Sequence, residues 1–193
     1  MSDKIKIVAL AGSTRVGSLN KKLIKASIPF LEEIGAEVTY VDLKDYPLPI
    51  YDGDLESQEG IPPLVRKLKD IFISADGFLI STPEYNGYFS GVFKNAIDWL
   101  SRPVEGYPPF ECFEGKTAGL LAASPGGMGG VRALLQVRQL LGGIRVLVTP
   151  YQFGLGHAGQ AFNDDGSFKD SKTIDSVSQV CQKLVEITKA VKK

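Results

Sequence analysis

Strand-length runs of apolar residues alternate with amphipathic helical patterns along nearly the whole chain. Continuous apolar or β-branched segments predict five strands, at residues 5–11, 37–43, 77–82, 117–123 and 144–149. Apolar positions that recur every three or four residues predict five helices, at residues 18–34, 64–72, 91–100, 130–141 and 174–188. Residues 45–63 contain four prolines and two glycines, which predicts a surface excursion, and residues 154–170 are predicted to form a loop.

This alternation predicts an α/β fold in which a parallel sheet lies between two layers of helices. Five strands favour a flavodoxin-like three-layer sandwich with the strand order 2-1-3-4-5. The length of 193 residues suits one domain over residues 1–193. Ligands of such sheets bind beyond the carboxyl ends of the strands. The loops after the first, third and fourth strands are therefore the places to look for chemistry.

Composition excludes several classes of protein. The 22 basic residues balance the 22 acidic ones, which argues against nucleic acid or an anionic membrane as the main partner. Cys112 and Cys181 lie far apart and the chain has one histidine, so neither a zinc site nor a disulfide framework is expected. No run approaches the ~20 apolar residues of a membrane span, and the apolar stretch at 5–11 is too short for a signal peptide. We expect a cytoplasmic protein with reduced thiols and no bound metal.

The loop after the first strand, residues 12–20, combines glycines, hydroxyl side chains and one arginine, and it runs straight into a helix. Free N–H groups at a helix start bind anions, and the guanidinium of Arg15 suits phosphate oxygens. The alternative is a tight turn in which Ser18 is simply the N-cap of the helix. Ser18 stands where a P-loop requires lysine, and Thr14 replaces the second glycine of a dinucleotide fingerprint. A single phosphate monoester therefore fits better than a triphosphate or a pyrophosphate.

The other two loops can enclose a flat ring. Residues 81–91 place a proline and glycines among three aromatic residues, and Asn86 can bind the polar edge of a ring. Residues 123–130 contain four glycines, which let the backbone approach a ligand closely and present N–H groups to it. The alternatives are aromatic residues that fill the core or a subunit contact, and a flexible glycine turn. One phosphate loop and two ring loops together indicate FMN.

Several motifs of this sequence resemble those of a known family. Residues 12–15 with Ser18 and Asn20, then residues 83–87, 90–91 and 94–98, are similar to the NAD(P)H-dependent FMN reductases. This flavodoxin-like family includes bacterial quinone, chromate and azo-dye reductases. Residues 124–127 and 162–166 also resemble it, so that the likeness covers nearly the whole chain.

The resemblance implies a set of site residues and a reaction. The implied phosphate-binding residues are Ser13, Arg15, Ser18, Leu19 and Asn20. The implied ring-binding residues are Pro83, Glu84, Tyr85, Asn86, Gly87, Ser124, Gly126 and Gly127. Hydride would pass from NAD(P)H to FMN, and from FMN to a quinone or a similar small-molecule acceptor such as an azo dye, chromate or free flavin. Members of the family are usually homodimers or homotetramers.

Two other functions compete with this hypothesis. A flavodoxin-type electron carrier also binds FMN, but such carriers tend to be acidic, whereas this chain has no net charge. A signalling module on the same fold needs carboxylates at the end of the first strand, and residues 9–12 have none. We assign no catalytic residue, because water or flavin N–H groups can supply protons. His157 in a glycine-rich loop is expected to be structural or exposed.

Overall fold

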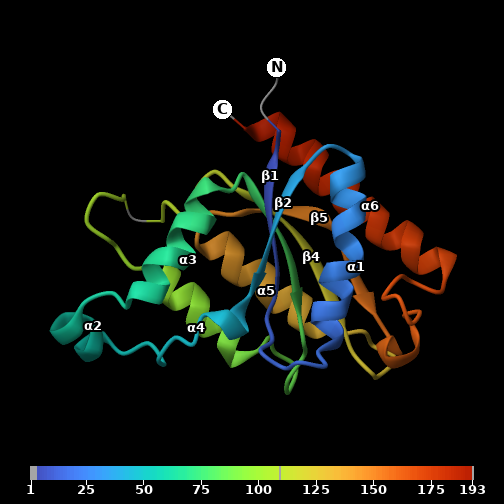
Figure 1. The fold of residues 1–193 in the computed structure, drawn as a ribbon, viewed down its shortest axis with the longest axis horizontal. Helices are drawn as coiled ribbons and strands as arrows, with labels where there is room; N and C mark the ends of the chain where they lie inside the picture. The colour runs from blue at the N-terminus through green and yellow to red at the C-terminus, as the bar shows by residue number, and fades with distance from the viewer. Residues whose placement is uncertain (1–3, 109, 193) are drawn as a thin grey trace.

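The computed structural model describes residues 4–108 and 110–192, and its centre is one five-stranded sheet (Figure 1). All neighbouring strands pair in parallel, in the order β2-β1-β3-β4-β5. The strands are β1 (Lys6–Ala11), β2 (Glu37–Asp42), β3 (Gly77–Thr82), β4 (Thr117–Ala123) and β5 (Leu147–Leu155). The predicted fold class and strand order are confirmed.

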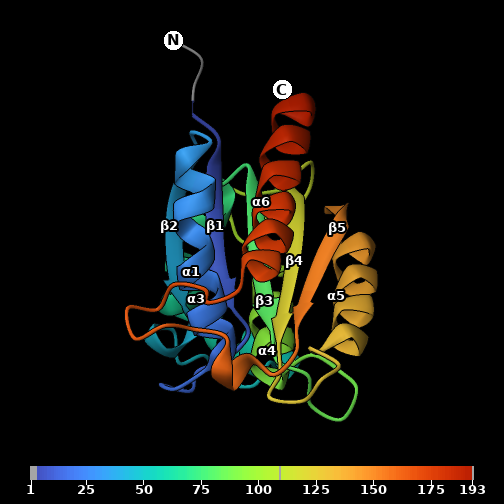
Figure 2. The same cartoon turned by 90° about the vertical axis from the view of Figure 1, so that its right-hand side faces the viewer.

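Helices cover both faces of the sheet. The described helices are α1 (Leu19–Glu33), α2 (Gly53–Glu59), α3 (Pro63–Ser74), α4 (Gly91–Leu100), α5 (Val131–Gly143) and α6 (Ser171–Val191), with short 3₁₀ turns at Leu43–Asp45 and Ala158–Gln160. All of them except α2, which buries no residue, pack into the apolar clusters of the sheet. The helices α1 and α6 lie side by side on one face (Figure 2) and share one buried apolar cluster with the sheet. The helices α3, α4 and α5 pack into the second cluster, on the opposite face.

Burial explains the apolar runs of the sequence. Every residue of the central strands β3 and β4 is buried, because helices cover both of their faces. The edge strands β2 and β5 instead contain exposed and half-buried residues. The central strands therefore have continuous apolar sequences, whereas β2 alternates in the usual way of a half-covered strand.

The segment 45–63 lies on the surface as predicted, but it contains a helix, α2, that was not predicted. This helix has no buried residue, so its sequence carries no apolar periodicity that could have indicated a helix. Its start is held by Asp52, whose side chain accepts a hydrogen bond from the backbone N of Asp54 at 2.8 Å. The chain thus has six α-helices in its described part and not the predicted five.

The predicted fifth strand at 144–149 is also wrong in its bounds. Ile144 is the C-cap of α5, and Arg145 has a left-handed backbone with φ of 72°. The strand begins at Leu147 and continues to Leu155, beyond Pro150, which has no N–H to donate. The register shifts there, since the pairing passes from Ala118–Val148 to Leu120–Gln152. A bulge on an edge strand accommodates the proline.

The carboxyl ends of the strands, and the loops that follow them, meet at the lower end of the molecule in Figure 2. The loop after β1 is joined there to β3 and α4. The backbone N of Gly12 donates to the carbonyl oxygen of Ser81 at 2.8 Å, and the Oγ of Ser90 donates to the carbonyl oxygen of Gly12 at 2.5 Å. In the part of the chain that the structure describes, no helix combines the length and hydrophobicity that crossing a membrane requires.

Candidate functional site

The loop after β1 leads directly into α1 and presents backbone donors. Ser18 is the N-cap of α1, and its Oγ accepts a hydrogen bond from the backbone N of Lys21 at 3.3 Å. The first amides of a helix have no acceptor inside the helix. Within the described residues, the amides of Leu19 and Asn20 have none elsewhere either. Because the start of a helix is partly positive, these two amides are suited to bind an anion.

Two serines and an arginine complete this end of the site. Ser13 and Ser18 are each only 4% exposed. The Oγ of Ser13 accepts a hydrogen bond from the backbone N of Arg15 at 3.3 Å, which leaves its O–H group free to donate. The side chain of Arg15 is exposed at the edge of the loop. Two hydroxyls, two amides and one guanidinium are together a set of donors suited to a phosphate.

The side chain of Asn20 also forms hydrogen bonds with the backbone at the end of the sheet. Its Nδ2 donates to the carbonyl oxygen of Ala123 at 3.0 Å, and its Oδ1 accepts from the backbone N of Ala123 at 2.9 Å. The pairing of β3 with β4 ends at Thr82–Ala122, so the side-chain amide of Asn20 occupies the place of the next peptide. The Oδ1 atom also accepts from the Oγ of Ser81 at 2.6 Å. Asn20 therefore joins α1 to the ends of β3 and β4.

The loop after β3 forms a tight hairpin that carries two exposed aromatic rings. Backbone hydrogen bonds run in both directions between Tyr85 and Tyr88, at 2.8 and 3.0 Å. Asn86 and Gly87 between them have φ of 55° and 80°. Positive φ at both central residues is typical of an Asn-Gly pair in a type I′ turn. Tyr85 and Tyr88 remain 47% and 52% exposed, so the hairpin places two aromatic side chains at the rim of the site.

Glu84 lies at the base of this hairpin, and its carboxylate is bonded to Arg132 of α5. The contact joins the loop after β3 to the loop after β4. Sequence reasoning did not include Arg132 among the site residues, because 48 positions separate it from Glu84 and no local motif connects them.

The loop after β4 lies directly against the end of β5. A Cβ atom on Gly156 would be 2.5 Å from the carbonyl oxygen of Gly127, and a Cβ on Gly129 would collide with Gly154. Two backbones that approach so closely require glycine at the contacts, which explains this part of the sequence. His157 is exposed, has a left-handed backbone with φ of 49°, and lies beside Gly127.

A cavity of about 80 Å³ lies where the three loops converge. Most of the predicted site residues line it: Ser13, Arg15, Ser18, Leu19, Asn20, Pro83, Glu84, Tyr85 and Ser124. Ala123 and Pro125 line it as well and were not predicted. Asn86, Gly87, Gly126 and Gly127 do not line the cavity, and they lie further along the same two loops. The fold thus brings the first loop together with the beginnings of the other two.

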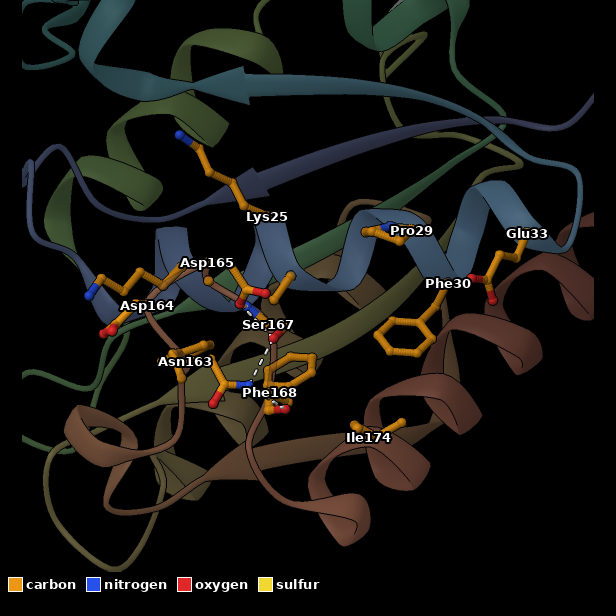
Figure 3. Close-up of a pocket in the computed structure, with 14 residues that line it drawn as sticks. Lys25, Pro29, Phe30, Glu33, Asn163, Asp164, Asp165, Ser167, Phe168 and Ile174 are labelled. Atoms are coloured by element: carbon orange, nitrogen blue, oxygen red, sulfur yellow. Dashed lines mark hydrogen bonds between the residues drawn. The ribbon is translucent and has the colours of Figure 1, made fainter.

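A larger groove of about 530 Å³ lies outside this cluster of loops, between α1 and residues 162–168 (Figure 3). Phe30 and Phe168 belong to its apolar lining. The polar side chains of the segment satisfy one another, as where the Oδ1 of Asp165 accepts from the backbone N of Ser167 at 2.9 Å. All the charged residues that line the groove are exposed. The groove is larger than the cavity at the strand ends, but it lacks that cavity's buried hydroxyls and free helix amides.

Two buried lysines lie away from the site, at the ends of helices. The Nζ of Lys116 donates to three carbonyl oxygens at the end of α3, at 2.6 to 2.7 Å. The Nζ of Lys69 donates to the carbonyl oxygen of Leu100, at the end of α4, at 2.6 Å. Burial lowers the pKa of both amines, that of Lys116 to about 8. Burial also raises the pKa of the Cys112 thiol beside Lys69. The two lysines are bonded to backbone acceptors, which indicates a structural role.

The covered parallel sheet and its strand order define a flavodoxin-like α/β protein, and the donors at the start of α1 give it a candidate site suited to a phosphorylated ligand. The sequence model described as "NADPH-dependent FMN reductase" matches residues 5–160. The chain belongs to this family.

Curated and solved proteins agree with that assignment. An NAD(P)H-dependent FMN reductase of Pseudomonas aeruginosa is 36% identical over 186 residues, which cover 95% of each chain. A quinone reductase of Escherichia coli K12 is 38% identical over 142 residues, 73% of this chain and 71% of that one. The solved structure of FerB, a flavoenzyme NAD(P)H:(acceptor) oxidoreductase from Paracoccus denitrificans, has a TM-score of 0.84 at 29% identity. That match covers 97% of this chain and 98% of FerB.

Proposed function

We propose that this chain is an FMN-dependent oxidoreductase that passes hydride from NAD(P)H, through FMN, to quinones or similar electrophilic acceptors. One observation carries the proposal: two free helix amides, two buried serines and an arginine line the same cavity as the loops after β3 and β4. The donors in this cavity suit a phosphate, and the two loops that extend from it could flank a flat ring attached to that phosphate. The relatives from P. aeruginosa, an FMN reductase, and from E. coli, a quinone reductase, support the same function.

The phosphate end of FMN fits the donors of the first loop. The hydroxyls of Ser13 and Ser18 and the amides of Leu19 and Asn20 would each donate to a phosphate oxygen. The guanidinium of Arg15 would add a charge-assisted contact from the solvent side. Both polar ends of the Asn20 side chain are already bonded to Ala123, so we infer that Asn20 binds phosphate through its backbone amide.

The ring end of FMN would lie between two loops. Residues 83–87 would form one flank, and Ser124, Gly126 and Gly127 the other. Successive amides of a glycine-rich loop can bind the polar edge of a ring. Bound FMN supplies the hydride chemistry, while the protein orients the reactants and limits the access of water. No side chain needs to act as an acid or base.

The acceptor would approach from the open side, over an apolar rim. Tyr85, Tyr88 and Met128 are 47%, 52% and 59% exposed and lie on the two ring loops. Such a rim offers flat surfaces without a specific hydrogen-bonding pattern. We therefore expect several flat electrophiles to react, quinones among them.

Exposed apolar side chains also support a homodimer or homotetramer. Met128, Val131 and Leu135 remain 59%, 40% and 59% exposed at the start of α5, next to the site. Neighbouring exposed apolar residues of this kind are typical of a subunit contact.

We place the protein in the cytoplasm, in line with its two buried free cysteines, Cys112 and Cys181.

An absorption experiment tests the proposed function. The purified protein is loaded with FMN, desalted, and mixed without oxygen with NADPH or NADH. We expect flavin absorption that survives desalting, is lost on addition of the nicotinamide, and returns on addition of a quinone. Retained flavin that neither nicotinamide reduces would instead indicate an electron carrier. Absence of retained flavin would contradict FMN as a resident cofactor.

A further inference from the structure

The N-cap residue of α5 has no side chain that could accept a hydrogen bond from the first amides of the helix. That residue is Gly130, whose φ is 84°, and a Cβ placed on it would be 2.9 Å from the Cβ of Ala122. Serine, threonine or aspartate, the usual N-caps, would therefore be strained there and would press on β4. The structure accordingly has no side-chain hydrogen bond from the N-cap of α5. A side-chain cap for this helix can therefore come only from another segment.

Glu84 provides that cap from the loop after β3. Its Oε2 accepts a hydrogen bond from the backbone N of Arg132 at 3.2 Å, and its Oε1 accepts from the Nε of the same residue at 2.7 Å. The Nη2 of Arg132 forms an ion pair with Oε1 as well. The side chain of Glu84 is 9% exposed, whereas that of Arg132 is 60% exposed. Glu84 is thus a mostly buried carboxylate with one cationic partner in the described structure.

The contact lies at the border of the candidate site. Glu84 directly precedes the hairpin of Tyr85 and Tyr88, and it lines the same cavity as Ser124 of the glycine loop. Arg132 is the second residue of α5, which begins directly after that glycine loop. The two ring loops are therefore tied together by one carboxylate and one guanidinium.

We propose that Glu84 and Arg132 form a positioning pair, which holds the two ring loops at a fixed separation and keeps the charge beside the bound ring balanced. The inference rests on the proposed FMN function and assigns these two side chains a role in it. Glu84 contributes through Arg132 and α5, and its carboxylate does not itself bind the ring.

If the pair balances charge, removing either of its charges should change the midpoint potential of bound FMN. A contact that only fixes the spacing of the loops would not produce shifts that depend on the sign of the charge removed. Adding electrons to the flavin is opposed by a nearby negative charge and favoured by a positive one. Removal of the Arg132 charge leaves the buried Glu84 carboxylate unpaired, so the midpoint potential of bound FMN should fall. Removal of the Glu84 charge leaves Arg132 unpaired, so the potential should rise. With both charges removed, the potential should return close to that of the wild type.

The experiment compares E84Q, R132M and the double variant, each loaded with FMN. Glu84→Gln keeps an oxygen that can accept from the backbone N of Arg132, so α5 remains capped. A matched control is the pair Glu114–Arg145, with 2.9 Å between Oε2 and Nη1, which is exposed and lies outside the cavity. E114Q and R145M alter the same two chemical groups there. The measurements are the midpoint potential of bound FMN, the FMN dissociation constant, and the melting temperature without FMN.

We expect potential shifts of opposite sign in E84Q and R132M, a small residual shift in the double variant, and none in the controls. The FMN dissociation constant of R132M should rise about tenfold, and that of the double variant should rise less, because the two groups act as a pair. If wild-type protein retains FMN but the potentials of E84Q and R132M shift with the same sign, or equal that of the wild type, the proposed pair is wrong. Wild-type protein that retains no FMN would overturn the proposed function itself.

Discussion

The hydrogen bonds of Asn20 lead to the most direct prediction about stability. Asn20 is 3% exposed, and its side chain forms hydrogen bonds with three buried groups, namely the backbone N–H and C=O of Ala123 and the hydroxyl of Ser81. Substitution Asn20→Ala deprives these three groups of their hydrogen-bond partner, because the methyl group of alanine can neither donate nor accept. The change tests whether a side-chain amide of α1 completes the sheet between β3 and β4.

The magnitude follows from the cost of leaving buried polar groups unbonded, which is about 1–3 kcal/mol for each. Water from the adjacent cavity can reach part of the exposed backbone, so the full sum does not apply. We expect a loss of about 2–4 kcal/mol, a large share of the ~5–15 kcal/mol that holds a typical domain folded. The melting temperature should fall by about 5–15 °C for a chain of this length.

The assay is urea unfolding of the protein without FMN, followed by the fluorescence of Trp99. This residue is the only tryptophan and is fully buried, so its emission reports loss of the core. Asn163→Ala is the matched control. Asn163 also makes side-chain hydrogen bonds, to Ser167 and Phe168, but it is exposed and water can replace them.

The control should lose less than about 1 kcal/mol. The reasoning is refuted if Asn20→Ala unfolds within ~0.5 kcal/mol of the wild type, or no more easily than Asn163→Ala. Either outcome would mean that the bonds to Ala123 add nothing to the sheet.

Three further predictions concern the phosphate loop, the glycine loop and a buried lysine. Arg15→Ala should raise the FMN dissociation constant about tenfold in a fluorescence titration, with little change in melting temperature, because the exposed side chain makes only a charge-assisted contact. Gly130→Ala should cost about 2 kcal/mol or more in urea unfolding, since φ is positive and Ala122 is too close, whereas Gly142→Ala, with open space around it, should cost nothing. The folded-state pKa of Lys116 is about 8, below its ordinary 10.5, so the unfolded chain binds more protons between these values. The contribution of Lys116 to stability should therefore rise from pH 8 to 10.5. The difference in urea midpoint between wild type and Lys116→Met should change across that window. A constant difference would contradict the lowered pKa.

Local patterns in the sequence determined the alternation of strands and helices, the parallel sheet and the three loops that line the candidate site. The central strands β3 and β4 are buried on both faces, so they must be apolar throughout, and that is visible without a structure. Ser18 caps α1 within three residues, and the hairpin between Tyr85 and Tyr88 turns on adjacent Asn86 and Gly87. Interactions of such short range can be recognised along the chain.

Some elements had no such local signal. The helix α2 buries none of its residues, so no apolar periodicity marks it. The bounds of β5 depend on how an edge strand containing Pro150 pairs with β4 around a bulge, and this register is set by the neighbouring strand.

The contacts that organise the site were decided only by the tertiary structure. Asn20 meets Ala123 across 103 positions, and Glu84 meets Arg132 across 48. Asparagine and glutamate can be satisfied by many partners, and nothing in their own sequence neighbourhood selects one. The selection is made by packing, because the sheet ends at Ala123 next to α1, and because Gly130 leaves the start of α5 open to a carboxylate from the neighbouring loop.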